Sequence, residues 1–242
     1  MRSNTRAPKS SASTPRAGVP RKPAPRLVAD ANVGDTKGRI LDATFRCLAT
    51  RGYAALRVRD IAEEAGVNVA LINYHFGSKD QLVLDVLDAA NEKLLDRQRQ
   101  MYRGKVGFAA KWAEARRFYE SDLASGFVRV QAELMAAAYA NPWLKEHVTP
   151  RVAAWGNPIH ETVREIFEEM AAQGVALPQA ITPEVVTNWV CNFWIGMEVG
   201  DLLGGWSPPE RANAKALTAV QELLDSLDAR AAKRLPARRT RR

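Results

Sequence analysis

The stretch VRDIAEEAGVNVALINYHFGSKDQL, residues 58–82, decides the fold of this chain. Its first apolar residues recur at helical spacing and predict a short helix that ends at Gly66. Asn68 is a good N-cap for a second short helix that runs to about residue 75. Ser78 and Gln81 then match a capping box, in which each side chain bonds to the other's backbone amide, and begin a longer helix. Two short helices separated by a glycine turn are typical of a helix-turn-helix.

The second short helix is expected to have one face toward the core and one toward solvent. Ile72 and Phe76, four residues apart, are expected to face the core. Because successive residues turn by about 100°, Ala70 and Tyr74 then point away from it. The residues that flank this outward strip are Leu71 and Asn73. Such a strip is the surface that a DNA major groove would meet.

The sequence before this stretch carries further motifs at a fixed spacing from it. They are ILDA at 40–43, Phe45 and RGY at 51–53. Together with residues 58–82, they resemble the DNA-binding domain of the tetracycline-repressor (TetR) family of bacterial transcription regulators. The resemblance covers residues 39–84, about a fifth of the chain. It implies an all-α protein in which a three-helix DNA-binding domain precedes a helical domain for effector binding and dimerisation.

The resemblance also implies which side chains contact the bases of a double-stranded DNA operator. They are Arg59 on the first short helix and Val69, Ala70, Leu71 and Asn73 on the second. A guanidinium can bind guanine bidentately, and small apolar side chains can pack on thymine methyl groups. Asn73 stands where the family usually has a tyrosine, so the base preference of relatives is not carried over. The alternative role for Arg59 is a solvated surface charge.

Phosphate contacts are implied for Tyr74, His75 and Lys79. Lys79 lies at the start of the longer helix, whose free amides and positive dipole end also favour a phosphate. The alternative for His75 is an imidazole packed in the core. A dimer with two-fold symmetry would bind a pseudo-palindromic operator.

The rest of the chain also shows helical spacing, without a convincing run of period-two alternation, so the fold class is all-α. The expected helices span about 37–51, 58–65, 68–75, 78–103, 108–123, 127–140, 158–173, 183–203 and 208–229. Pro142 and Pro150 are each expected to end or kink a helix. Asn157 and Pro158 are expected to be an N-cap and the first helical residue.

The last two expected helices match in position the pair that forms the dimer interface in the family. Their own sequences also favour a homodimer. The residues concerned are Gly196 and Gly200 and the seam of Leu217, Val220, Leu224 and Leu227. Two glycines four residues apart let another backbone approach closely, and the seam has the spacing of paired helices. The alternative is that both surfaces are used inside one protomer.

A site for a small, largely apolar effector is expected between helices of the second domain, where aromatic residues and methionines are concentrated. The side chains favoured as ligand contacts are Tyr139, Trp143, Trp189 and Phe193. Trp189 and Phe193 stand one turn apart on one helix. Glu133, Glu198 or His147 could tune the site toward a cation or a hydrogen-bonding group. Each of the aromatic residues can instead be ordinary core.

The 242 residues carry a net charge of +8, of which +6 lies in residues 1–38 and +7 in residues 229–242, leaving −5 between them. Residues 1–34 hold five prolines and no aromatic residue, and are expected to be disordered rather than a helical transit peptide. The expected organisation is a basic arm at 1–34, a helix-turn-helix DNA-binding domain at 35–82, a helical effector-binding and dimerisation domain at 83–229 and a basic tail at 230–242. Basic ends favour nucleic acid, and a solubility tail is the alternative.

Other function classes find little support in the sequence. Cys47 and Cys191 lie 144 residues apart, which favours two reduced, buried thiols. The longest apolar run, residues 134–140, is far too short to cross a membrane, so a soluble cytoplasmic protein is expected. No phosphate loop, metal-ligand cluster or activated nucleophile is found, so no enzyme, cofactor or metal is expected.

The expected function is that of a ligand-responsive repressor that binds its operator as a homodimer and is released by the effector. An activator or a global regulator of the same family is an alternative. A second alternative is a helical protein-interaction module without DNA specificity.

Overall fold

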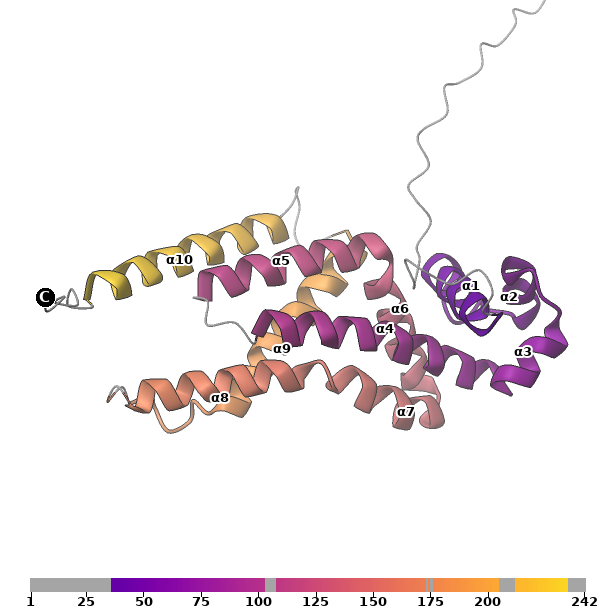
Figure 1. Cartoon of the computed structure of the whole chain (residues 1–242), viewed down its shortest axis with the longest axis horizontal. Coiled ribbons are helices and arrows are strands. Elements are labelled where there is room, and N and C mark those ends of the chain that lie inside the picture. The colour runs from indigo at the N-terminus through magenta and orange to yellow at the C-terminus, as the bar shows by residue number, and fades with distance from the viewer. Residues whose placement is uncertain (1–35, 103–107, 173, 175, 205–211, 235–242) are drawn as a thin grey trace, which may run out of the picture.

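The computed structural model describes residues 36–102, 108–172, 174, 176–204 and 212–234. These residues form ten α-helices and no strand, which confirms the expected all-α class. The molecule is elongated, with α1, α2 and α3 together at one end (Figure 1). Within the same ranges, no helix is long and apolar enough to cross a membrane. The expected arm at 1–34 and residues 235–242 of the tail lie outside the described residues.

The bounds of the helices agree with the expected ones to within a few residues in most places. The helices are α1 (Thr36–Arg51), α2 (Val58–Ala65), α3 (Val69–Phe76), α4 (Lys79–Tyr102), α5 (Phe108–Ser125), α6 (Phe127–Ala140), α7 (Pro142–Ala153), α8 (Gly156–Ala172), α9 (Pro183–Leu202) and α10 (Ala212–Arg234). The expected start of the last helix, at residue 208, falls outside the described part of the chain.

The helix-turn-helix, formed by α2 and α3, owes its boundaries to local capping. Gly66 ends α2 at a φ of +64°, in the left-handed conformation that glycine adopts without strain. Asn68 caps α3, because its side-chain oxygen accepts a backbone amide of the first turn at 2.8 Å. Ser78 Oγ accepts the Gln81 amide at 3.0 Å, but Gln81 Nε2 donates to Asp85 at 2.7 Å. The expected return bond of the capping box, from the Ser78 amide to Gln81 Oε1, is not formed, because the Ser78 amide donates to the carbonyl of residue 76 at 2.8 Å instead.

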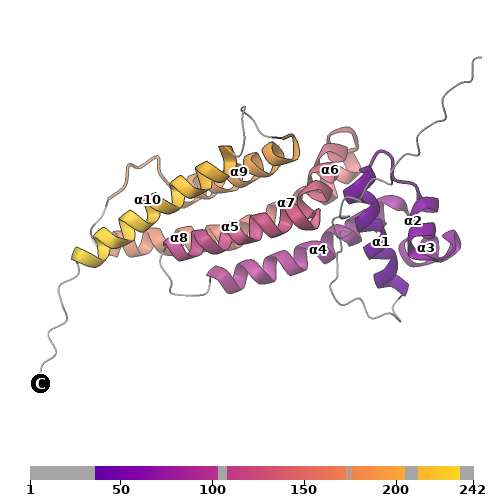
Figure 2. The same ribbon diagram turned by 90° about the horizontal axis from the view of Figure 1, so that it is seen from above.

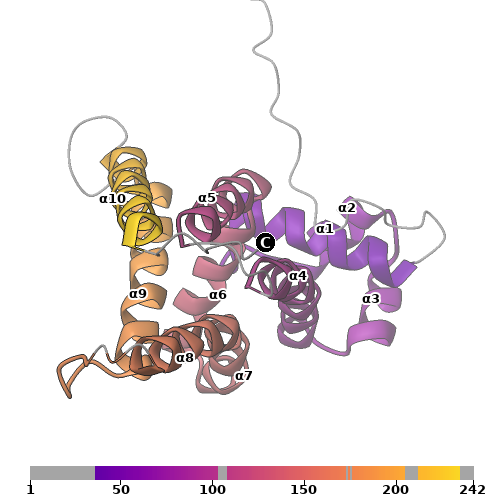
Figure 3. The same cartoon turned by 60° about the vertical axis from the view of Figure 1, so that its left-hand side comes forward.

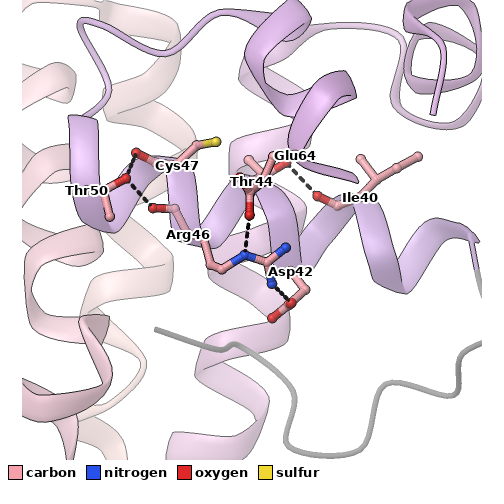
Figure 4. A network of polar contacts seen from close by, with 7 residues as sticks. All are labelled: Ile40, Asp42, Thr44, Arg46, Cys47, Thr50 and Glu64. Atoms are coloured by element: carbon pink, nitrogen blue, oxygen red, sulfur yellow. Dashed lines mark hydrogen bonds and ion pairs between the residues drawn. The ribbon is translucent and has the colours of Figure 1, made fainter. Parts of the chain in front are cut away.

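Two arginines of α1 hold α2 in place. Arg39 Nη2 donates to the carbonyl oxygens of residues 65 and 66, at 2.7 and 3.2 Å, and so satisfies carbonyls at the end of α2. Arg46 pairs with Asp42 on its own helix and with Glu64 on α2, the latter at 2.8 Å (Figure 4). The two short helices are thus fixed by charged contacts as well as by their apolar faces.

One apolar core joins this three-helix unit to the helices that follow. Ile40 and Leu48 of α1 and Ile61 of α2 are fully buried. They belong to the same cluster as Leu84 of α4 and Leu134 of α6, and the cluster continues into α7. Helices α1, α2 and α3, here called the DNA-binding unit after the family domain that their sequence resembles, are therefore packed directly on α4 and α6.

The proline-rich stretch after α6 is more helical than the sequence predicts. Asn141 caps α7 and Pro142 is its first residue, whereas Pro150 lies inside that helix. Residue Gly156 begins α8, so the expectation that Asn157 caps it is wrong. Pro158 falls within the first turn of α8, where the missing N–H costs no hydrogen bond, and the helix can therefore begin ahead of it.

In the C-terminal part, α6 lies among α4, α5, α7 and α9 (Figure 3). The last helix, α10, runs along α5 (Figure 2). Trp112 Nε1 on α5 donates to the carbonyl of Leu217 on α10 at 3.1 Å. Leu217 itself is 2% exposed and packs with Tyr119 and Met197 in a second, smaller apolar cluster. Helices α4, α6 and α7 share the main core, whereas α5, α9 and α10 meet in this much smaller apolar cluster.

Candidate functional site

The outward strip of α3 lies where the sequence predicts it. Ile72 and Phe76 are buried, and Tyr74 is 83% exposed on the opposite face. Ala70 is exposed as well. Of the two flanking residues, Leu71 is half-buried and Asn73 is exposed, and Val69 at the start of the helix is half-buried. The orientation of the helix is therefore confirmed, while its contacts with DNA remain a prediction.

His75 and Arg59, for which the sequence left two roles open, are both exposed. The His75 ring lies 5.2 Å from that of Tyr74 in an edge-on contact. Packing in the core is thus the wrong role for His75. Arg59 lies on α2, so its guanidinium is available either to DNA or to solvent.

Lys79, at the start of α4, lies over the ring of Tyr53. Its Nζ lies 4.1 Å from the centroid of the Tyr53 ring, a cation–π distance. The Tyr53 hydroxyl donates to Asp80 Oδ1 at 2.6 Å. Burial, with this hydrogen bond and the charge of Asp80, raises the pKa of Tyr53 well above its ordinary value. The hydrogen bond to Asp80 holds the Tyr53 side chain in place, with its ring beneath the lysine.

The same tyrosine connects the DNA-binding unit to α6. Glu133 Oε2 on α6 accepts the Tyr53 amide at 3.1 Å. A Cβ at Gly52, whose φ is +77°, would lie within 2.5 Å of the Glu133 carboxylate. Asn141, at the end of α6, donates to Asp80 Oδ2 at 3.5 Å. Glu133 therefore lies at this junction, and it lines none of the cavities described below, although the sequence suggested that it could tune the ligand site.

A cavity of about 590 Å³, here called the outer cavity, opens between α6, α7, α8 and α9. Among the predicted ligand contacts it is lined by Tyr139 alone. The other residues that give it its character are Val148, Val152, Trp155, Cys191 and Ile195, with His160 and Glu184 at polar positions. Its size and mostly apolar wall suit a small organic molecule.

The sequence predicts that Trp189 and Phe193 line a ligand cavity, but they lie on the face of α9 that points away from the outer cavity. The outer cavity is lined by Thr187, Cys191 and Ile195, which recur every four residues. Trp189 and Phe193 are offset from these by two positions, or about 200°, and so lie on the opposite face. They line neither this cavity nor two others, which are the inner cavity described below and a cavity bordered by α1, α4, α5 and α6. 

Trp143 lines none of these cavities either. It lies on α7 and its ring stacks on that of His147, with the two centroids 4.2 Å apart. The Nδ1 atom of His147 lies 2.8 Å from the Trp143 carbonyl oxygen. Both side chains are thus engaged with each other on their own helix.

A second, smaller cavity of about 60 Å³, here called the inner cavity, lies behind Trp155, which lines both. Its polar wall consists of Gln98, Asp122, Gln131 and Glu198, from four different helices. Asp122 is paired with Arg97 at 2.7 Å. Burial and the nearby Asp122 charge raise the pKa of Glu198 to about 7. The sequence did not predict this cluster, apart from Glu198 as a residue that could tune the ligand site.

Large apolar side chains stand exposed on α9 and just beyond it, and on α10. They are Trp189, Phe193, Leu202, Leu203 and Leu223. Of the predicted dimer seam, Leu217 is used inside the protomer, whereas Val220 and Leu224 are half-buried. The Leu227 side chain lies outside the described residues. Gly200 is buried, while a Cβ at Gly196 would meet no described atom within 4 Å.

In the part of the chain that the structure describes, no group of three or more His, Cys, Asp or Glu side chains could hold a metal ion. Cys47 is buried and Cys191 is half-buried, and both are free thiols. Burial raises the pKa of each thiol.

Known proteins resemble this chain most clearly in the DNA-binding unit. Residues 40–86 match the sequence profile of the family described as bacterial regulatory proteins, tetR family. An HTH-type transcriptional repressor of Mycobacterium tuberculosis is 51% identical over 55 residues, which are 23% of this chain and 29% of the repressor. The chain thus matches less than a third of the length of this relative.

Two similarities extend into the C-terminal part. The HTH-type transcriptional repressor KstR2 of Rhodococcus jostii is 24% identical over 147 residues, which are 58% of this chain and 69% of KstR2. The solved structure of the transcriptional regulator FadR from Bacillus subtilis, in complex with stearoyl-CoA, gives a TM-score of 0.62 at 17% identity. That match covers 77% of this chain and 96% of FadR, and at such an identity it shows a shared fold.

Proposed function

Residues 40–86 place this chain in the tetR family of bacterial regulatory proteins, and from that premise we propose that it is a ligand-responsive transcriptional repressor. It binds a pseudo-palindromic DNA operator as a homodimer and is released by a small, largely apolar effector. Two of its relatives are named as transcriptional repressors, which supports repression.

The exposed face of α3 is the observation that carries this proposal. A short helix that buries Ile72 and Phe76 while it leaves Tyr74 83% exposed offers an otherwise unused surface to a partner. A convex helix of this kind fits the major groove, which is about 12 Å wide. The proposed base contacts are Arg59, Val69, Ala70, Leu71 and Asn73, and the proposed phosphate contacts are Tyr74, His75 and Lys79.

Homodimer formation through α9 and α10 is supported by apolar side chains that the protomer leaves exposed. Trp189 is 57% exposed and Leu223 is 58% exposed. Two-fold pairing of these helices would bury both sets against each other, which stabilises the dimer in proportion to the apolar area removed from water. Trp189 and Phe193 are therefore proposed as dimer contacts, in place of the ligand contacts that the sequence suggested.

Release by an effector is supported by the way two helices join the cavities to the DNA-binding unit. On α6, Gln131 lines the inner cavity and Glu133, two residues later, accepts the Tyr53 amide. Helix α4 begins directly after α3 and carries Gln98 to the same cavity. A ligand that prefers the DNA-free arrangement of these helices by about 2.7 kcal/mol weakens the operator complex a hundredfold.

The proposal is tested by the different effects of two cations on DNA binding. An operator is first selected from random duplexes with the wild-type protein, and affinities are then measured by fluorescence anisotropy. Arg59→Ala is expected to weaken the binding free energy for the operator by about 1–3 kcal/mol, because a base contact is lost. It is also expected to reduce the sequence preference at one base pair of the operator. Lys79→Ala is expected to weaken all duplexes alike and to reduce the salt slope by about one, because a phosphate contact is lost.

Arg164→Ala provides the matched control, because Arg164 is an exposed arginine on α8 that pairs with Glu168 and lies far from α3. It removes one positive charge without touching the proposed interface and is expected to leave both affinities unchanged. If Arg59→Ala and Arg164→Ala behave alike, Arg59 does not read a base.

A further inference from the structure

The inner cavity carries an inference about the chemical class of the effector, which rests on the function proposed above. We propose that the inner cavity binds a protonated amine of the effector, and that the apolar part of the same molecule occupies the outer cavity. Trp155 lies in the wall of both cavities, so a ligand whose head group passes this side chain reaches from one to the other.

One hydrogen-bond acceptor in the wall of the inner cavity has no donor. Gln98 is only 9% exposed and lines the cavity, and its Oε1 atom has no hydrogen-bond partner among the described residues. A buried, unsatisfied carbonyl oxygen costs about 1–3 kcal/mol, so a donor that reaches it is stabilised. Asp122 and Glu198 present carboxyl groups to the same space. An ammonium group has donors only, and therefore complements these three acceptor groups.

The charges around the cavity also favour a single cation. Arg97 on α4 pairs with Asp122 on α5, so these two charges balance. Glu198 on α9 has no ion pair or hydrogen bond within the part of the chain that the structure describes. When it ionises, the cluster carries a net charge of −1, and one bound monocation would neutralise it.

The remaining wall and the volume fit an ammonium group as well. The aromatic side chains that line the cavity are Phe118, Tyr119, Phe127, Trp155 and Trp194. The faces of aromatic rings attract cations, most strongly in a desolvated site. A volume of about 60 Å³ holds roughly four water molecules, enough for an ammonium group and too little for a ring system. The larger apolar part of a ligand must therefore lie in the outer cavity.

The protonation of Glu198 gives the site a pH dependence. Without ligand, burial holds the pKa of Glu198 at about 7, so the carboxyl is about nine-tenths protonated at pH 6 and ionised at pH 8. The other ionisable groups around it are Asp122 and Tyr119 on α5 and Arg97 on α4, which is paired with Asp122. An alkylamine keeps its charge across this range, because its pKa resembles that of lysine. Amine affinity is therefore expected to rise about tenfold from pH 6 to pH 8.

The test uses three probes with the same chain and different head groups: n-octylamine, n-octanol and octanoate. Binding to the full-length protein is measured by thermal shift and by quenching of tryptophan fluorescence. At pH 8, octylamine is expected to bind at least tenfold more tightly than octanol, and octanoate more weakly than either. Glu198→Gln, which keeps the size of the side chain, is expected to bring octylamine and octanol within about twofold of each other. Circular dichroism confirms that the variant is folded.

Glu184→Gln is the matched control, because Glu184 is an acid that lines the outer cavity only. It is expected to leave the preference for octylamine intact. Loss of the preference in Glu184→Gln but not in Glu198→Gln would place the amine in the outer cavity and overturn the proposal. Equal binding of octylamine and octanol by the wild-type protein, or no binding of octylamine, would overturn it too, since the inner cavity would then hold water only.

Binding is measured without DNA, so this outcome is independent of operator release. If octylamine binds with the expected preference but leaves operator affinity unchanged, the amine site stands and effector release is wrong. If the amine preference is missing but another ligand releases the operator, the proposed function stands and the amine site is wrong.

Discussion

The DNA-binding unit and the C-terminal part of this molecule differ in how their interiors are packed. Around α1, α2 and α3 the core is apolar and continuous, and Leu48, Ile61 and Leu84 are fully buried in it. Around α5, α8 and α9 the interior holds the outer and the inner cavity, and buried polar groups such as Gln98 and Asp122 line the inner one. A densely packed core transmits displacement, whereas a cavity leaves room for a ligand. The difference fits the proposed function, in which the recognition surface stays rigid while the other part responds to a small molecule.

The largest effect is a loss of unfolding free energy, expected when a side chain of the packed core is truncated. A side chain on the wall of the outer cavity provides the comparison. Leu48→Ala removes a fully buried side chain and is expected to lower the free energy of unfolding by about 2–5 kcal/mol. Ile195→Ala, on the wall of the outer cavity, is expected to cost less than half of that, because the side chain already faces open space. Urea denaturation measures both. Equal losses would mean that the outer cavity is closed in solution and that the two parts are packed alike.

The next effect concerns the apolar surface of α9 and α10. Leu223→Asp places a charge on a 58% exposed side chain and is expected to weaken the dimer at least a hundredfold, or about 2.7 kcal/mol, if that surface is buried between protomers. Leu177→Asp serves as the control, because Leu177 is exposed in the segment between α8 and α9. Light scattering gives the mass. A folded Leu223→Asp variant with the mass of the wild type would place the interface elsewhere.

The buried carboxyl of Glu198 in the inner cavity is expected to make the stability of the protein depend on pH. A carboxyl whose folded-state pKa lies above its unfolded value binds extra protons when folded, so stability falls as pH rises between these values. For Glu198, with about 7 against an ordinary 4.5, the loss from pH 5 to pH 7 is about 2 kcal/mol. Glu198→Gln is expected to abolish that part of the decline without ligand present. The free energy of unfolding of both proteins is measured by denaturation from pH 5 to pH 7. If it changes with pH to the same extent in both, Glu198 is ionised and solvated in the folded protein.

The smallest effect is expected at the contact between Glu133 on α6 and the Tyr53 amide of the DNA-binding unit. Glu133→Gln replaces the charged acceptor of the Tyr53 amide by a neutral one, which is expected to weaken this contact by about 1 kcal/mol. Hydrogen exchange of the Tyr53 amide should then speed up about fivefold. Glu161→Gln, at an exposed position on α8, should leave it unchanged. An unaltered rate in Glu133→Gln would mean that the apolar core alone holds the DNA-binding unit on α6.

The DNA-binding unit could be predicted closely because its boundaries depend on local chemistry. Gly66 needs a left-handed conformation to end α2, and Asn68 needs only an amide one turn ahead to begin α3. The exposure of Tyr74 follows from helical geometry once Ile72 and Phe76 face the core. Signals of this kind lie within a few residues of each other, so the sequence shows them directly.

The cavities could not be predicted in the same way. Choosing Trp189 and Phe193 by residue type missed the register of α9, in which Thr187, Cys191 and Ile195 recur on the cavity face. The proline reasoning failed at α8, because the first turn of a helix tolerates proline at more than one position.

The inner cavity is a tertiary feature. Its polar groups come from four helices, α4, α5, α6 and α9, and each group taken alone is an ordinary residue on a helix. No spacing in the sequence brings them together. Only the packing of those helices shows that Gln98 and Glu198 face the same space.

The claim that α3 reads a DNA sequence is tested most directly by one titration. The wild-type protein is titrated with its selected operator and with a scrambled duplex of the same length and composition, at one fixed salt concentration. The account predicts that the operator binds at least about a thousandfold more tightly, as specific complexes do. Equal affinity for the two duplexes would contradict it, because charge alone would then explain all DNA binding.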